Sequence, residues 1–192
     1  MSDPVISYHT ERHTDLAICR ACGGACCQSI PGIYHPKDLE RIYNEPISAD
    51  IILKMFLEKN TAVDWWEGDP RPENKYYWDD EGNMAYPLGS GYSCVYFLRP
   101  KGIKAKHKLR DASWGANPCV HFKFGHGCQL DPEKMPLQCR ALVPHIRIDP
   151  ADGQPVCGIP ENEKATKQDL CIAWIPYQEM ITEAMEKHDS LI

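Results

Sequence analysis

Residues 19–27 read CRACGGACC, and the rest of the chain is organised around this stretch. It holds Cys19, Cys22, Cys26 and Cys27 within nine residues, with two glycines in the middle. Free cysteines are usually scattered through a protein core as small hydrophobic residues. Four of them in one glycine-containing turn therefore indicate a metal ion, a metal cluster or a disulfide knot.

The composition favours a metal over disulfides. The chain has 192 residues, of which 43% are hydrophobic and 25% charged, as in a soluble globular domain. Its first residues show no basic start followed by an apolar run, so we expect no secretory signal and a cytoplasmic location. In that reducing compartment structural disulfides are rare, whereas thiolate metal sites are common.

Two further partner classes are disfavoured. No stretch reaches the roughly 20 apolar residues that a membrane helix requires, so no membrane partner is expected. The net charge of −6 argues against a general nucleic-acid binder. A protein partner or a redox enzyme remains the expected class of partner.

The spacing within the turn suits a shared site. Cys19 and Cys22 form the two-residue-spaced pair that chelates zinc or an iron–sulfur cluster, and Cys26 can add a third thiolate from the same loop. Cys26 and Cys27 are adjacent, and neighbouring side chains in extended backbone point to opposite sides. We therefore expect either one ligand and one buried thiol, or two ligands that serve different metals.

A second block of cysteines can supply the missing ligands. These residues lie in loops rich in Gly and Pro, so they would reach the site from loops and not from one helix. The last of them is a plausible eighth thiolate. The block consists of Cys119, Cys128, Cys139 and Cys157.

The other candidate ligands are weaker. Cys94 stands outside both blocks, and Cys171 lies in the apolar stretch LCIAWI, which predicts a buried core thiol. His121 and His126 are close to the cysteines in sequence and can replace a thiolate in a zinc site, although a supporting or surface role is favoured for both.

The chain is interpreted as one small, irregular α+β domain over residues 1–192. Helical spacing and capping residues predict several short helices. Turn signals predict one or two antiparallel hairpins. A metal or cluster site would join the N-terminal and C-terminal cysteine loops. The helices are expected at 36–43, 49–59 and 177–188, and the hairpins within 61–98 and 141–159.

An aromatic and basic stretch at about 61–118 is interpreted as an insertion. Within it, residues 99–110 carry six Lys or Arg in twelve positions of an acidic protein. A solvated loop or a lysine-guarded edge strand is one interpretation. A docking site for an acidic partner is the other.

The order of these motifs resembles that of the YkgJ-like, or CxxCxxCC, cysteine-cluster family. The matching elements fall in two blocks, at about 17–45 and 117–160. They are the turn at 19–27, Cys119-Val-His-Phe, Gly127-Cys128 and Met135-Pro-Leu-Gln-Cys139-Arg140. The chain departs from the family at Met135-Pro136, where Arg-Pro is usual, and at Gln129-Leu130, where an aromatic residue is usual.

The resemblance implies a metal site. Proteins of this family are described as zinc- or iron-chelating domains, and relatives of flagellin lysine N-methylase, for which an iron–sulfur cluster is proposed, belong to it. The implied ligands are Cys19, Cys22, Cys26, Cys27, Cys119, Cys128 and Cys139, with Cys157 matching a less constant position.

Three functions follow from these observations. The first is an iron–sulfur protein with one or two [4Fe–4S]-type clusters, acting in electron transfer or in support of a partner enzyme, since seven or eight thiolates exceed the four of one structural zinc. The second is a zinc-stabilised binding module. The third is a lysine N-methylase-like enzyme, which rests on family analogy alone. Whether the protein is an enzyme stays open.

Overall fold

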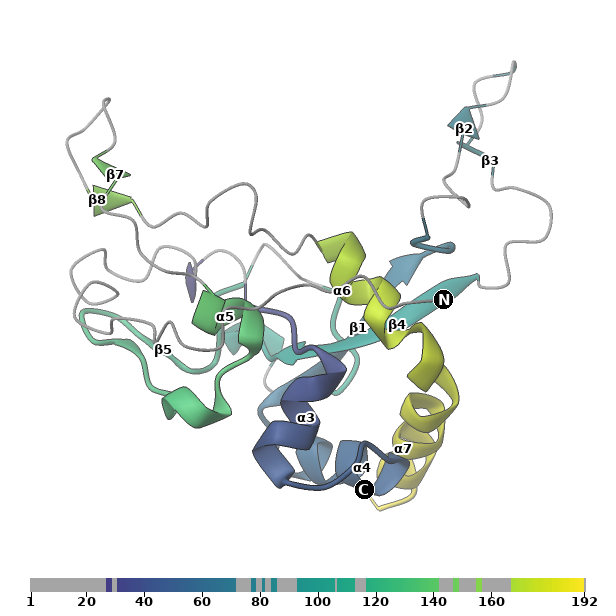
Figure 1. The fold of residues 1–192 in the computed structure, drawn as a ribbon, viewed down its shortest axis with the longest axis horizontal. Coiled ribbons are helices and arrows are strands. Elements are labelled where there is room, and N and C mark those ends of the chain that lie inside the picture. Colours follow the sequence, from purple (N-terminus) through teal and green to yellow (C-terminus); the bar gives the residue numbers. More distant parts are fainter. Residues whose placement is uncertain are drawn as a thin grey trace.

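The structure is a computed structural model that combines short helices with two-stranded antiparallel sheets, and the predicted α+β class is confirmed (Figure 1). The described residues are 27–28, 31–71, 77–78, 81, 84–85, 93–105, 107–112, 117–141, 147–148, 155–156 and 167–191.

The longest sheet lies at the centre of the fold. It consists of β1 (Thr61–Glu67) and β4 (Cys94–Pro100), which pair antiparallel in a continuous register from Thr61 opposite Pro100 to Glu67 opposite Cys94. Val63, Phe97 and Leu98 are each 0% exposed and belong to the hydrophobic core. The stretch expected as an insertion therefore supplies the central strands of the core.

Within residues 31–71, the two helices that precede the sheet lie close to the positions predicted for them. α3 (Pro36–Tyr43) begins after His35, whose side chain accepts a hydrogen bond from the backbone of Lys37. α4 (Ala49–Leu57) begins after Ser48, whose hydroxyl accepts from the backbone N–H of Ile51. Both are N-caps, which satisfy N–H groups that the first helical turn cannot pair internally.

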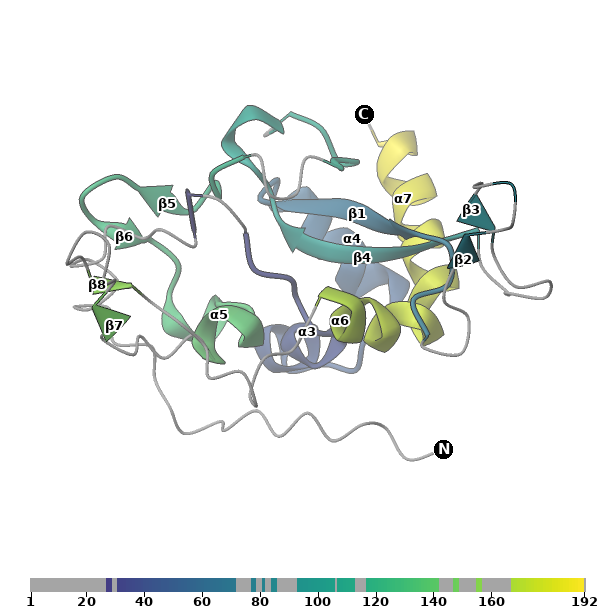
Figure 2. The ribbon, with the colours of Figure 1, turned by 90° about the horizontal axis from the view of Figure 1, so that it is seen from above.

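The C-terminal helices close the core. α6 (Lys167–Trp174) was not predicted, and it leads through the 3₁₀ turn η5 (Ile175–Tyr177) into α7 (Gln178–Ser190), which matches the helix expected at 177–188. Cys171 and Trp174 of α6 are each 0% exposed, which confirms the buried core thiol. Figure 2 shows α4 and α7 beside the β1–β4 sheet, with α6 across it.

Three smaller antiparallel pairs have strands of two residues each. β2 (Tyr77–Trp78) with β3 (Met84–Ala85) lies within the stretch 61–98, and β7 (Arg147–Ile148) with β8 (Pro155–Val156) lies within 141–159, where hairpins were predicted. β5 (Phe122–Lys123) with β6 (Gly127–Cys128) was not predicted. Among the helices in the described ranges, none has the length and hydrophobicity of a membrane span.

Part of the stretch 99–110 is buried and takes part in an ion-pair network. A solvated loop was one of the two interpretations of this stretch from the sequence. Arg99 is 0% exposed, and its guanidinium contacts the carboxylates of Asp64 at 2.8 Å and Asp111 at 2.9 Å. Lys101 is also buried. The solvated interpretation is therefore wrong for these two basic residues, and for Arg99 the paired carboxylates offset the cost of burying the charge.

Candidate metal centre

Half of the predicted cysteine ligands lie among the described residues. Cys119 is buried at 5% exposure, and Cys27, Cys128 and Cys139 are half-buried. The other four predicted ligands, Cys19, Cys22, Cys26 and Cys157, lie outside the described residues.

The structure places the end of the N-terminal cysteine turn beside the second cysteine block. The backbone N–H of Cys119 donates to the carbonyl of Cys27 at 2.8 Å, across more than ninety residues of sequence. Cys119 also forms an antiparallel bridge with Gly102. We call the region where residues 27–38 meet residues 117–139 the cysteine junction.

Cys139 enters the junction from a short helix. α5 (Leu137–Ala141) places this thiol against Gly32, and a Cβ atom added to Gly32 would overlap the Cys139 sulfur. The neighbouring backbone N–H of Ile33 donates to the side-chain oxygen of Gln138 at 2.7 Å. Gly32 is therefore needed for its lack of a side chain, which lets the extended segment pass directly over the thiol.

A buried carboxylate fixes the start of α5. Asp38 of α3 is 0% exposed, and both of its carboxylate oxygens lie 2.9 Å from the backbone N–H of Leu137, the first residue of α5. Arg41 contacts Asp38 at 3.0 Å and donates to the carbonyls of Glu133 and Met135 in the preceding segment. Burial raises the pKa of Asp38, while these hydrogen bonds oppose the shift.

Tyr34 belongs to the first of the two segments that meet at the junction. Its side chain is 3% exposed, and its main chain is held by Leu98 of β4 and by the indole N–H of Trp174, which donates to the Tyr34 carbonyl at 2.7 Å. Burial raises the pKa of the Tyr34 phenol well above its usual value, and nearby Cys139 and then Cys119 raise it further. The phenol therefore lies within electrostatic reach of both thiols.

The hairpin β5–β6 carries Cys128 back toward the same region. Cys128 pairs with Phe122, which follows Cys119 by three residues, and the backbone N–H of Gln129 donates to the carbonyl of His121. Burial lowers the pKa of His121, which favours the neutral imidazole. His126 is exposed near the tip of the hairpin.

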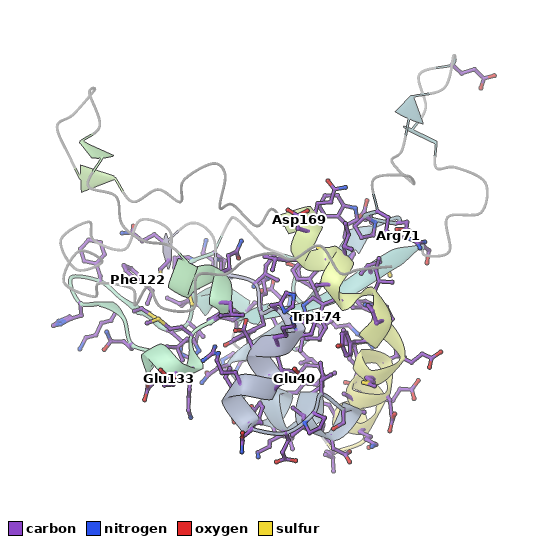
Figure 3. The ribbon with its side chains drawn as sticks, in the orientation of Figure 1. Glu40, Arg71, Phe122, Glu133, Asp169 and Trp174 are labelled. Atoms are coloured by element: carbon purple, nitrogen blue, oxygen red, sulfur yellow. The ribbon has the colours of Figure 1, made fainter. Side chains whose placement is uncertain are left out.

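Figure 3 draws the side chains of the described residues in the orientation of Figure 1. Phe122 and Glu133 are labelled on the side of the molecule that holds β5 and α5. Arg71 is labelled on the opposite side, and Asp169 is labelled between the two sides, on α6.

The donor chemistry of the junction fits a thiolate-bound metal, but the described thiols do not close a site. Within the described part of the chain, no group of three or more His, Cys, Asp or Glu side chains is placed to hold a metal ion. Structural zinc and iron–sulfur clusters both use four ligands, mostly Cys. A metal at the junction would need the thiolates of Cys19, Cys22 or Cys26 in addition to those described here.

Cys94 and Cys171 lie apart from this arrangement. Cys94 begins β4, eight residues before Gly102, which corresponds to roughly 26 Å of extended chain. Cys171 faces the core from α6, and burial raises the pKa of its thiol. Neither position suits a thiolate ligand at the junction.

Comparison with known proteins gives no family for the chain. No family model, curated protein or solved structure matches it. The cysteine junction and the cysteine pattern of the sequence are therefore the features that point to a function.

Sequence reasoning missed the residues that build the junction around the cysteines. Gly32, Tyr34, Arg41 and Gln138 gave no signal beyond their local context, because their partners are about a hundred residues away. Asp38 was recognised only as favourable near the positive end of α3. It does accept from the backbone N–H of His35 at 2.8 Å, but it also caps α5.

Proposed function

We propose that this protein binds a metal through cysteine thiolates at the cysteine junction, and that the metal is an iron–sulfur cluster used in electron transfer or in support of a partner enzyme. The observation that carries the proposal is the backbone contact between Cys27 and Cys119, with Cys139 held nearby against Gly32. Cys27 is more than ninety residues from Cys119 and Cys139 in the sequence, and it is the last residue of the dense turn at 19–27.

The number of thiolates favours a cluster over a single zinc. Seven or eight candidate ligands exceed the four that one structural zinc needs, and they suit one or two four-cysteine clusters. The resemblance of the cysteine pattern to that of the YkgJ-like family supports a chelating role. A reducing, cytoplasmic location would keep the thiols available for metal.

The ligands would come from both sides of the junction. Cys19, Cys22 and Cys26 would supply one side, with Cys27 either as a ligand or as a buried thiol. Cys119 and Cys139 would supply the other side, and Cys128 and Cys157 are the additional candidates. When bound, the cluster would supply one-electron redox chemistry at this site. The chain would supply thiolates, burial and the nearby Tyr34 phenol, which can donate a hydrogen bond.

The direct test is anaerobic purification, followed by an absorption spectrum and by assays of iron and acid-labile sulfide. We expect a brown protein that contains both. A colourless protein with stoichiometric zinc, which takes up no iron and sulfide on anaerobic reconstitution, would contradict the cluster and support a zinc-stabilised module.

Two matched variants locate the site. Cys139→Ser should lose most of the iron, because it removes a thiolate of the junction while keeping nearly the same side-chain shape. Cys94→Ser is the control, because this half-buried cysteine lies at the start of β4, whereas Gly102, which contacts Cys119, follows the end of that strand. Full iron content in Cys139→Ser would show that the site does not include the second cysteine block.

A further inference from the structure

The charges of this protein are strongly segregated. Residues 101–130 contain six Lys or Arg and one Asp, a net charge of +5, so the rest of the chain carries −11 of the total of −6. The single Asp of this segment, Asp111, is buried against Arg99. No acidic side chain therefore neutralises the exposed lysines from within the segment.

The structure decides which of these basic residues can meet a partner. Lys101 is buried, and Arg110 forms an exposed ion pair with Asp189 of α7 at 3.8 Å. Lys104, Lys108 and Lys123 are exposed. Among the described residues of this segment, these three lysines and the ion-paired Arg110 are the exposed basic side chains.

Hydrogen bonds join the turn that holds Lys104 to the segment that leads into the hairpin of Lys123. The 3₁₀ turn η2 (Ile103–Ala105) is joined to the strand-like residues before β5, because Ile103 N–H donates to the carbonyl of Pro118 at 2.8 Å and Lys104 N–H donates to the side chain of Asn117 at 2.9 Å. The β5–β6 hairpin follows directly. Figure 2 shows this hairpin and the segment after β4 at the same end of the central sheet.

Two apolar side chains are exposed among these lysines. Phe124, at the tip of the hairpin, is 81% exposed, and Ile103 of η2 is 44% exposed. Phe124 contacts the ring of Phe122 edge-on, with ring centres 6.4 Å apart, which supports its outward position. Gly125 and Gly127, both with positive φ, form the turn that projects it.

We infer that Ile103, Lys104, Lys108, Lys123 and Phe124 form a docking face for an electron-transfer protein with an acidic surface. Exposed apolar side chains in a segment with exposed lysines have the composition of an interaction patch with a polar rim. The choice of an electron carrier rests on the proposed function, because Cys119 and Cys128 lie at the base of the same hairpin.

Charge complementarity favours a compact acidic protein over a nucleic acid. A long polyanion bound at this face would extend past it toward a remainder that carries −11, and would be repelled there. An acidic patch of protein size can meet the basic face alone. Such contacts raise the rate of encounter and weaken as salt screens the charges.

The test measures binding of the anaerobically purified full chain to two immobilised acidic electron carriers, a plant-type ferredoxin and a flavodoxin. We expect at least one to bind at 20 mM NaCl, with affinity falling about tenfold or more at 200 mM NaCl as the charges are screened. The variant Lys104→Glu/Lys108→Glu/Lys123→Glu should abolish this binding, and Phe124→Ser should weaken it about tenfold, as for an aromatic anchor.

The control variant is Lys37→Glu/Lys54→Glu/Lys59→Glu, which makes the same charge change on exposed lysines in and just after α3 and α4. It should keep most of the affinity. Equal loss in both triple variants, or binding to neither carrier, would overturn the docking face. Tighter binding of a single-stranded RNA oligonucleotide, lost only in the first variant, would assign the face to nucleic acid. Iron and sulfide assays on the same samples test the proposed function separately.

Discussion

At the scale of single residues, the surroundings of Cys171 separate this structural cysteine from the candidate ligands. Cys171 is 0% exposed in the core, and burial is the main cause of its raised thiol pKa. A metal ligand must be a thiolate, so a thiol held protonated is unsuited to the role. Cys119 and Cys139 instead lie at a junction where two distant segments meet and where Tyr34 is within electrostatic reach.

The raised pKa of Cys171 predicts a loss of stability in alkali. The folded state keeps this thiol protonated, while the unfolded chain releases the proton above its ordinary pKa of 9.0. The free energy of unfolding should therefore fall by an additional ~1.4 kcal/mol per pH unit above that value. Urea unfolding of the wild type and of Cys171→Ala between pH 8 and pH 10 measures the difference. Parallel pH profiles would show that Cys171 ionises equally in both states.

At the scale of elements, the sequence predicted what short-range signals encode. Pro36, the N-cap Ser48 and the apolar spacing of α4 and α7 identified three helices close to their observed bounds. α6 was missed because a 3₁₀ turn with Pro176 follows it at once and interrupts the helical spacing before α7. The pairing of β1 with β4 could not be specified from the sequence, because 26 residues separate the two strands.

The cysteine junction was also only partly predictable, because its contacts join residues that are far apart in the sequence. The sequence identified the cysteines by their density, but not the contacts that hold them. Asp38, Arg41 and Gln138 position α5 through bonds that span more than ninety residues. Such pairings depend on how the whole chain folds, and no local pattern of residues records them.

The close approach of α5 to Gly32 gives a prediction for the site. Gly32→Ala places a methyl group where the Cys139 sulfur lies, so α5 must shift. We expect the variant to fold and to retain less than half of the wild-type iron. Gly125→Ala is the control, because its Cβ would meet nothing within 4 Å and only its positive φ of 73° would add strain, about 1 kcal/mol. Undiminished iron in Gly32→Ala would show that Cys139 does not take part.

At the scale of the whole molecule, the cysteine junction adjoins the hydrophobic core, which includes Ile33 and Tyr34 of the junction. The core contains the β1–β4 sheet with α4, α6 and α7 around it, and it buries Phe56, Phe97 and Trp174. The junction lies at the edge of this core, where residues 27–38 meet residues 117–139. A metal bound there, as proposed, would join these two segments and add to their stability.

Amide hydrogen exchange before and after anaerobic removal of the metal with a chelator tests most directly whether a metal joins the two segments at the cysteine junction. If the metal lies at the cysteine junction, its removal should speed exchange at the N–H groups of Ile33, Cys119 and Leu137, which bridge the two segments. The amides of α4 and the β1–β4 sheet should keep most of their protection. Unchanged exchange at the three bridging amides after the metal has been removed would contradict a metal centre at the cysteine junction.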